Sequence, residues 1–150
     1  MRGENPRLVS GKNMWQTYAL LSAFFAALTA IFAKIGVSDI NSNLATAIRT
    51  AVILAIAWAA AFATCDVSQM RRISGHAFLF LILSGCATGL SWLFYFKALK
   101  LADASKVAPV DKLSVVFTMV LAFLILGEQP SLKVVAGCAL IFAGALAIII

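Results

Sequence analysis

Charged residues are scarce in this chain: 12% of its 150 residues are Asp, Glu, Lys or Arg, and 63% are hydrophobic. Soluble domains carry about 25% charged residues, so the composition excludes an ordinary soluble domain. The mean hydropathy of +1.00 favours an integral membrane protein instead. A net charge of +6 does not indicate nucleic-acid binding, because the basic residues are scattered between apolar stretches and form no basic patch.

Residues that build metal centres and catalytic sites are also few. The chain has one histidine, His76, and its three cysteines, Cys65, Cys86 and Cys138, are widely spaced without a CxxC pair. This pattern predicts no disulfide framework and no metal site. No nucleophile, base and orienting group stand out as a set, so we expect no enzymatic activity and no cofactor.

Long apolar runs dominate what is present. Each run has about 20 residues, enough for a helix that rises 1.5 Å per residue to cross roughly 30 Å of hydrocarbon. Hydrophobicity is continuous along each run and does not alternate, which favours helices over strands. The five runs cover residues 15–37, 44–64, about 77–98, about 107–126 and 132–150. The fold class predicted is all-α integral membrane, with a disordered basic arm over residues 1–13 and one five-helix domain over residues 14–150.

An odd number of spans places the two termini on opposite sides of the membrane. Lysine and arginine normally fix the orientation by gathering in cytoplasmic loops, but here they divide evenly. With the N-terminus inside, the basic residues facing in are Arg2, Arg7, Lys12, Arg71, Arg72 and Lys133, and those on the outer half are Lys34, Arg49, Lys97, Lys100, Lys106 and Lys112. Either the chain inserts in both orientations and pairs as an antiparallel dimer, or another feature orients it.

Small residues recur at helix-packing spacing. Gly85 and Gly89 form a GxxxG pattern in the third run, and alanines repeat every four residues in the second and fifth. Such spacing lets helix backbones approach closely in a bilayer. We therefore predict a packed bundle, in which the two glycines have a structural role.

Polar side chains follow one face of the third and fourth runs. Ser84, Thr88, Ser91 and Tyr95 share a face of the third run by helical spacing. Asp111, Ser114 and Thr118 share a face of the fourth in the same way. Either the two faces oppose each other and line a cavity, or the hydroxyls bond to carbonyls of their own helices and the charges lie at the membrane surface.

The charged pair Asp111 and Lys112 follows Pro109, to which we assign a structural role. If the fourth helix begins near Ser105, the pair lies about 9 Å inside it, whereas a start at Pro109 places the pair in the first turn. Neighbouring helical residues are about 100° apart, so the two side chains are not expected to point at one partner. Ionisable groups at membrane depth are costly and usually functional.

We predict a substrate site that combines these side chains with nearby aromatic and basic ones. Its members are Arg49, Trp92, Tyr95, Lys97, Asp111, Lys112, Ser114 and Thr118. Cations outnumber carboxylates on this half of the membrane, which predicts a preference for substrates that carry a carboxylate or phosphate. Glu128 closes the fourth run, where the helix dipole disfavours an anion. We expect it to be a structural clasp, paired with Lys133 or with the N–H groups that open the fifth helix.

Two segments, ALKLADASKVAPV and LILGEQPSLKVVAGCALIFAGALAIII, resemble the EamA domain of the drug/metabolite transporter superfamily. The resemblance rests on the aromatic end of the third run (95–99), a small-residue link (102–105), Gly127-Glu128, and a glycine-containing fifth run (137–144), with Arg49 at a position where the family commonly has arginine. It implies a ten-helix assembly around a central cavity and transport by alternating access. This chain has one five-helix unit where most members have two, and Val115 stands where the family tends to have proline.

These observations together predict a multi-pass transporter of the inner (cytoplasmic) membrane. We expect an antiparallel homodimer that carries small polar, anionic or zwitterionic metabolites and contacts membrane lipid. Two alternatives remain open: a flippase-like subunit for lipid-linked head groups, and a membrane scaffold subunit that transports nothing.

Overall fold

In the computed structural model, the described residues are 6–150, with side chains described from residue 14 onward except at positions 67, 69 and 71. Within this part of the chain, five helical segments are long and apolar enough to cross a membrane. The all-helical, five-span fold predicted from the apolar runs is therefore confirmed. Of the predicted arm over residues 1–13, the first five residues lie outside the described part, and the first helix begins at Pro6.

The helices follow one another with short links. They are α1 (Pro6–Val37), α2 (Ser42–Thr64), a 3₁₀ helix η1 (Val67–Arg72), α3 (Gly75–Leu101), α4 (Ala104–Asp111), α5 (Leu113–Leu121), a π-helical turn η2 (Ala122–Leu126) and α6 (Leu132–Ile149). The fourth span, Ala104–Leu126, is thus built from α4, α5 and η2.

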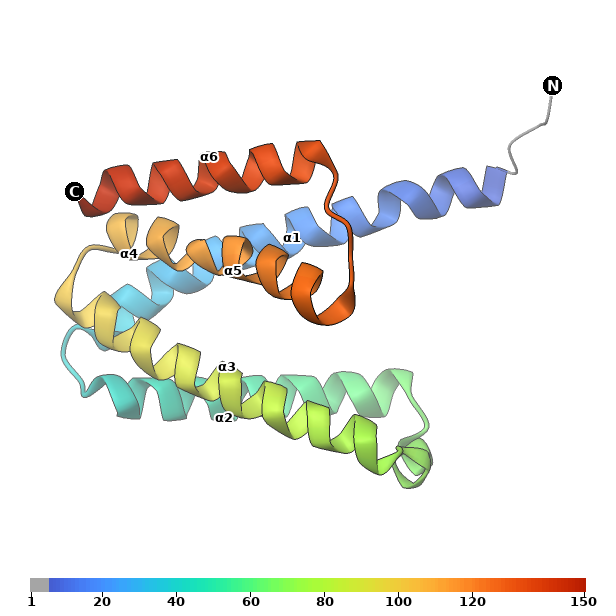
Figure 1. The fold of residues 1–150 in the computed structure, drawn as a ribbon. Helices are drawn as coiled ribbons and strands as arrows, with labels where there is room; N and C mark the ends of the chain where they lie inside the picture. The colour runs from blue at the N-terminus through green and yellow to red at the C-terminus, as the bar shows by residue number, and fades with distance from the viewer. Residues whose placement is uncertain (1–5) are drawn as a thin grey trace.

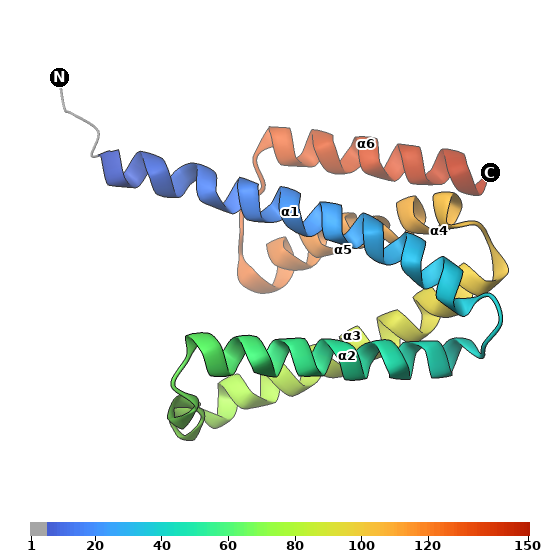
Figure 2. The ribbon, with the colours of Figure 1, turned by 180° about the vertical axis from the view of Figure 1, so that it is seen from behind.

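The helices form two arms that meet at one end of the molecule (Figures 1 and 2). In one arm α2 packs on α3, and in the other α4, α5 and α6 pack on one another. α1 contacts α2, α3 and α4. Both views show the arms meeting near the links 38–41 and 102–103, which we call the joined end, and diverging toward the end that carries η1.

The buried core is small and lies at the joined end. Val37 of α1 and Leu99 of α3 are 0% exposed, and Ala33, Ala45 and Phe96 complete the cluster. Elsewhere the helices expose leucine, isoleucine and phenylalanine on all sides. This is typical of helices that lie in lipid, where apolar side chains need not face inward.

Two lysines hold the links of the joined end. Lys34 Nζ, from the last turn of α1, donates to the carbonyl oxygens of Leu99 at 2.7 Å and Ala102 at 2.8 Å. Lys100 Nζ, from the last turn of α3, donates to the carbonyl of Ile40 at 2.6 Å. Because the last carbonyls of a helix have no partner within it, a cation there satisfies them and matches the helix dipole. Lys34 thus ties α1 to the end of α3, and Lys100 ties α3 to the link between α1 and α2.

Short polar side chains begin α2 and η1. Asn41 Oδ1 accepts from the backbone N–H of Asn43 at 2.8 Å, the usual arrangement of a helix N-cap. Asp66 accepts from both the backbone N–H and the hydroxyl of Ser68, and these hydrogen bonds hold the pKa of the Asp66 carboxyl below its ordinary value. Both links therefore have locally defined starts.

Candidate functional site

A polar cavity of about 360 Å³ lies between the first four spans. It has contributions from α1, α2, α3 and the junction of α4 with α5. The lining residues are Ser22, Phe25, Ala26, Thr29, Arg49, Ser91, Trp92, Tyr95, Asp111 and Lys112. The two arms of the fold thus both supply walls of this cavity, which we call the charged cavity.

Arg49 of α2 is held against aromatic rings of α3. Its guanidinium carbon lies 4.3 Å from the centroid of the Trp92 ring and 5.4 Å from that of Phe96. A guanidinium over an aromatic face is attracted by the ring quadrupole, and the attraction is larger where water is excluded. Among the described residues, Arg49 forms no ion pair with a carboxylate. The charge is therefore positioned but remains available to an anionic ligand.

The fourth span is interrupted where it meets the charged cavity. Pro109 has no N–H, so it cannot donate to the carbonyl four residues before it, and α4 ends two residues later at Asp111. Lys112, with φ −68° and ψ −7°, joins α4 to α5, and its N–H donates to the Pro109 carbonyl at 3.1 Å. Interrupted spans at a repeat interface are where secondary transporters bind their substrates.

Asp111 and Lys112 form an ion pair, with Lys112 Nζ 3.8 Å from Asp111 Oδ2. The side chains are 39% and 55% exposed respectively, so the pair is reachable by a ligand. From helical spacing we did not expect both to face one partner, yet both line the charged cavity. The reason is the junction at Lys112, whose backbone departs from helical geometry. Because α4 begins at Ala104, Asp111 is about 10 Å along the span, close to the deeper of the two positions considered.

Comparison with known proteins identifies the family of this chain. Residues 13–150 match the model of the EamA-like transporter family. The chain belongs to this family. It is 56% identical over 132 residues to an "Uncharacterized transporter in cobO 3'region" from Sinorhizobium sp, a match that covers 88% of this chain and 94% of that relative. No solved structure shows a significant match.

Family membership makes this chain a multi-pass membrane transporter and not an enzyme. The resemblance found in the sequence is thereby confirmed, as is the expectation that the protein is not an enzyme. The charged cavity of this EamA unit is lined by charged, aromatic and hydroxyl groups.

The structure brings together five of the eight side chains predicted for the site. Arg49, Trp92, Tyr95, Asp111 and Lys112 all line the charged cavity. The other three do not line it. Lys97 is exposed on α3, Ser114 is exposed on α5, and Thr118 lines a separate pocket of about 500 Å³ between α5 and α6.

Two hydroxyls of the two polar faces, both from threonine, bond within their own helices. Thr88 Oγ1 donates to the Ser84 carbonyl at 2.9 Å, and Thr118 Oγ1 donates to the Ser114 carbonyl at 2.8 Å. For these two threonines, the second of the two alternatives applies: the hydroxyl bonds to a carbonyl of its own helix and is not directed to a ligand. Ser91 is different, because it lies on the wall of the charged cavity.

The wall that α1 contributes was missed from the sequence. Ser22, Phe25, Ala26 and Thr29 line the cavity and are spaced i, i+3, i+4 and i+7, which places them on one face. Two hydroxyl residues seven positions apart in the first apolar run were the available signal. Because that run carries no charge before Lys34, its hydroxyl residues were not predicted to belong to the site.

Three of the residues assigned structural roles, Gly85, Gly89 and Glu128, do not line the charged cavity. A methyl group added at Gly85 or Gly89 would meet nothing within 4 Å, so this GxxxG face makes no close helix contact within the unit. Gly127, at φ 69°, ends η2, and the N–H of Glu128 donates to the Ala122 carbonyl at 3.3 Å. The Glu128 carboxylate forms no hydrogen bond or ion pair with any described residue, and thus does not pair with Lys133 or the start of α6.

Proposed function

We propose that this protein carries small polar metabolites, preferring anionic or zwitterionic ones, across the cytoplasmic membrane by alternating access. The working unit is an antiparallel homodimer in which two five-span units form one carrier. The observation that carries the proposal is Arg49, held over Trp92 in a cavity between both arms and without a carboxylate partner among the described residues.

The charge of the cavity supports the preference. Arg49 and Lys112 each contribute +1 and Asp111 contributes −1, which leaves 1 + 1 − 1 = +1 on the lining side chains. An uncompensated cation at membrane depth is costly, and binding of an anion reduces that cost. A substrate cation would meet the same charge as a repulsion.

The shape of the unit supports the homodimer. Its arms are packed together at the joined end and diverge toward the other end (Figure 1). Carriers built from inverted repeats place their substrate site between the two repeats. The matched region is 94% of the Sinorhizobium relative, so that protein too is about one five-span unit long.

Uptake into proteoliposomes tests the transport function. The purified full chain is reconstituted, and a panel of labelled carboxylates, phosphate esters, zwitterions and organic cations is offered. We expect accumulation of anions or zwitterions, its loss in Arg49→Gln, and partial retention in Arg49→Lys, which keeps the charge but not the planar stack. Preference for organic cations, or uptake equal in Arg49→Gln, would contradict the proposal. Activity confined to lipid-linked head groups would favour the flippase alternative.

Cysteine accessibility in intact cells tests the antiparallel arrangement. Cys65 is exposed in the link between α2 and α3, at the end opposite the joined end, and serves as a native reporter after Cys86→Ala and Cys138→Ala. Ser38→Cys, with Cys65→Ser, reports on the exposed link at the joined end. We expect each reporter to be labelled by an impermeant maleimide in about half of the molecules, as equal insertion both ways requires. Complete labelling of one reporter and none of the other would exclude it.

A further inference from the structure

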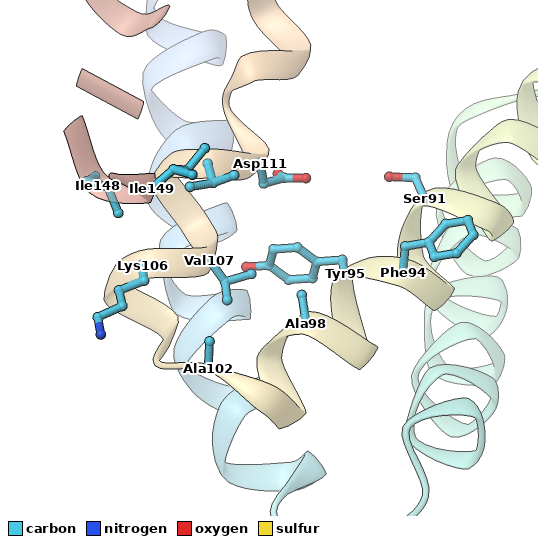
Figure 3. Close-up of a pocket in the computed structure, with 11 residues that line it drawn as sticks. Ser91, Phe94, Tyr95, Ala98, Ala102, Lys106, Val107, Asp111, Ile148 and Ile149 are labelled. Atoms are coloured by element: carbon cyan, nitrogen blue, oxygen red, sulfur yellow. The ribbon is translucent and has the colours of Figure 1, made fainter. Parts of the chain in front are cut away.

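A second cavity, of about 480 Å³, lies beside the charged one, between α3, α4 and α6. Its lining is mainly apolar, and Figure 3 shows these side chains around the cavity. They include Phe94 and Ala98 of α3, Val107 of α4, and Ile148 and Ile149 of α6. It is open on one side, where Phe94 is 70% exposed, and we call it the apolar chamber.

The two cavities share a wall. Ser91, Tyr95 and Asp111 line both of them. In Figure 3 the Asp111 carboxylate and the Ser91 hydroxyl point toward one another, and the Tyr95 ring lies below them with its hydroxyl toward Val107. A molecule at this wall therefore has Arg49 on one side and an apolar surface on the other.

The two cavities differ in their charged residues: Asp111 lines both, whereas Arg49 and Lys112 line the charged cavity alone. Lys106 is the one lysine that lines the apolar chamber, and its Nζ lies 3.9 Å from Asp103 and points away from the chamber (Figure 3). The lining side chains of the charged cavity carry a net charge of +1. Together the two cavities thus offer one anion site and one apolar site, joined at Tyr95.

We propose that the substrate is an amphipathic monoanion, an organic acid whose carboxylate binds Arg49 and whose apolar tail passes Tyr95 into the apolar chamber. This narrows the transport function proposed above and rests on it. A membrane acyl chain is a poorer occupant, because it brings no anionic group to the charged cavity and leaves Arg49 without a partner. An acid that reaches both cavities satisfies the cation and buries its tail at once.

Ligand binding to the full chain in lipid nanodiscs tests the inference. Trp15→Phe and Trp58→Phe leave Trp92, which touches the Arg49 guanidinium, as the sole tryptophan reporter of the three in the chain. Fluorescence titrations compare acetate, butyrate, hexanoate and octanoate with the corresponding alcohols. Burial of a methylene group predicts that affinity for the acids rises up to about fourfold per added methylene and then levels off. The alcohols should bind far more weakly.

Two alanine-to-leucine substitutions test whether the apolar tail of the acid lies in the apolar chamber. Ala98→Leu fills the apolar chamber, so the increase in affinity with tail length should stop at a shorter acid. Acetate should bind as it does to the parent protein. Ala60→Leu, on the exposed surface of α2, is the matched control and should leave the whole series unchanged. If Ala98→Leu destabilises the protein, Phe94→Ala gives the opposite test, because it enlarges the chamber and should extend the rise to longer acids.

The outcomes separate this inference from the transport function. Arg49-dependent binding of acids with no dependence on tail length would overturn the amphipathic substrate and leave the anion carrier standing. A length dependence that persists in Arg49→Gln would show lipid-like occupancy and overturn the inference as well. Absence of binding by any of the acids would overturn the inference and leave transport of phosphate esters and zwitterions to the uptake assay.

Discussion

Replacing Lys34 by methionine should destabilise the joined end more than any other single lysine substitution there. The ammonium of Lys34 donates two hydrogen bonds, at 2.7 and 2.8 Å, to the Leu99 and Ala102 carbonyls, and it is partly buried. Charge-assisted hydrogen bonds contribute about 1.5–3 kcal/mol each, and partial exposure reduces this by roughly half. The loss should therefore be about 2 kcal/mol, since methionine keeps the apolar stem but leaves both carbonyls without their donor.

Thermal unfolding of the purified chain in detergent, followed by circular dichroism, measures the loss. About 2 kcal/mol corresponds to a decrease in Tm of roughly 4–8 °C for a chain of this size. Lys97→Met is the matched control, because Lys97 lies on α3 two residues before Leu99, is exposed, and forms no hydrogen bond or ion pair with a described residue. We expect its Tm to change by no more than about 2 °C. Equal losses for the two variants would refute the assignment of stability to the bonds of Lys34.

Three further predictions concern the cavity and the fourth span. Trp92→Leu removes the ring whose centroid lies 4.3 Å from the Arg49 guanidinium carbon, and should weaken acid binding about fivefold, the equivalent of about 1 kcal/mol. Calorimetric titration measures the loss, and Trp92→Phe should give an intermediate affinity. Pro109→Ala restores a backbone donor inside α4 and should raise unfolding stability by up to about 3 kcal/mol while slowing uptake; a lower Tm would contradict this. Gly127→Ala places a side chain at φ 69° and should lower unfolding stability by about 1–2 kcal/mol, whereas Gly127→Asn should lower the Tm less.

The spans and much of the site could be predicted because their signals are local. An uninterrupted apolar run of membrane length specifies a spanning helix without knowledge of its neighbours. Charged and aromatic residues inside such runs stand out individually, which is how Arg49, Trp92 and Asp111 were identified before the cavity was known. The helix break at Lys112 also had a local cause in Pro109, although its exact place was not specified by the sequence.

What could not be predicted depends on contacts between distant parts of the chain. Lys34 binds carbonyls 65 and 68 residues away, and no local pattern distinguishes it from Lys97, which lies exposed. Ser114 and Thr118 share a helical face with Asp111 by spacing, but the junction at Lys112 separates α5 from α4, so that face does not continue into the charged cavity. The wall from α1 consists of ordinary small and aromatic residues, whose role arises only from the packing of α1 beside α3.

The length of α3 has a consequence for the membrane around the protein. α3 has 27 residues and is about 40 Å long. A hydrocarbon layer of roughly 30 Å matches α3 only when the helix is steeply inclined. Bilayer thickness therefore acts on the inclination of α3, and with it on how far the two arms diverge. Lipids with longer tails should favour the upright, closed shape and shorter tails the splayed one.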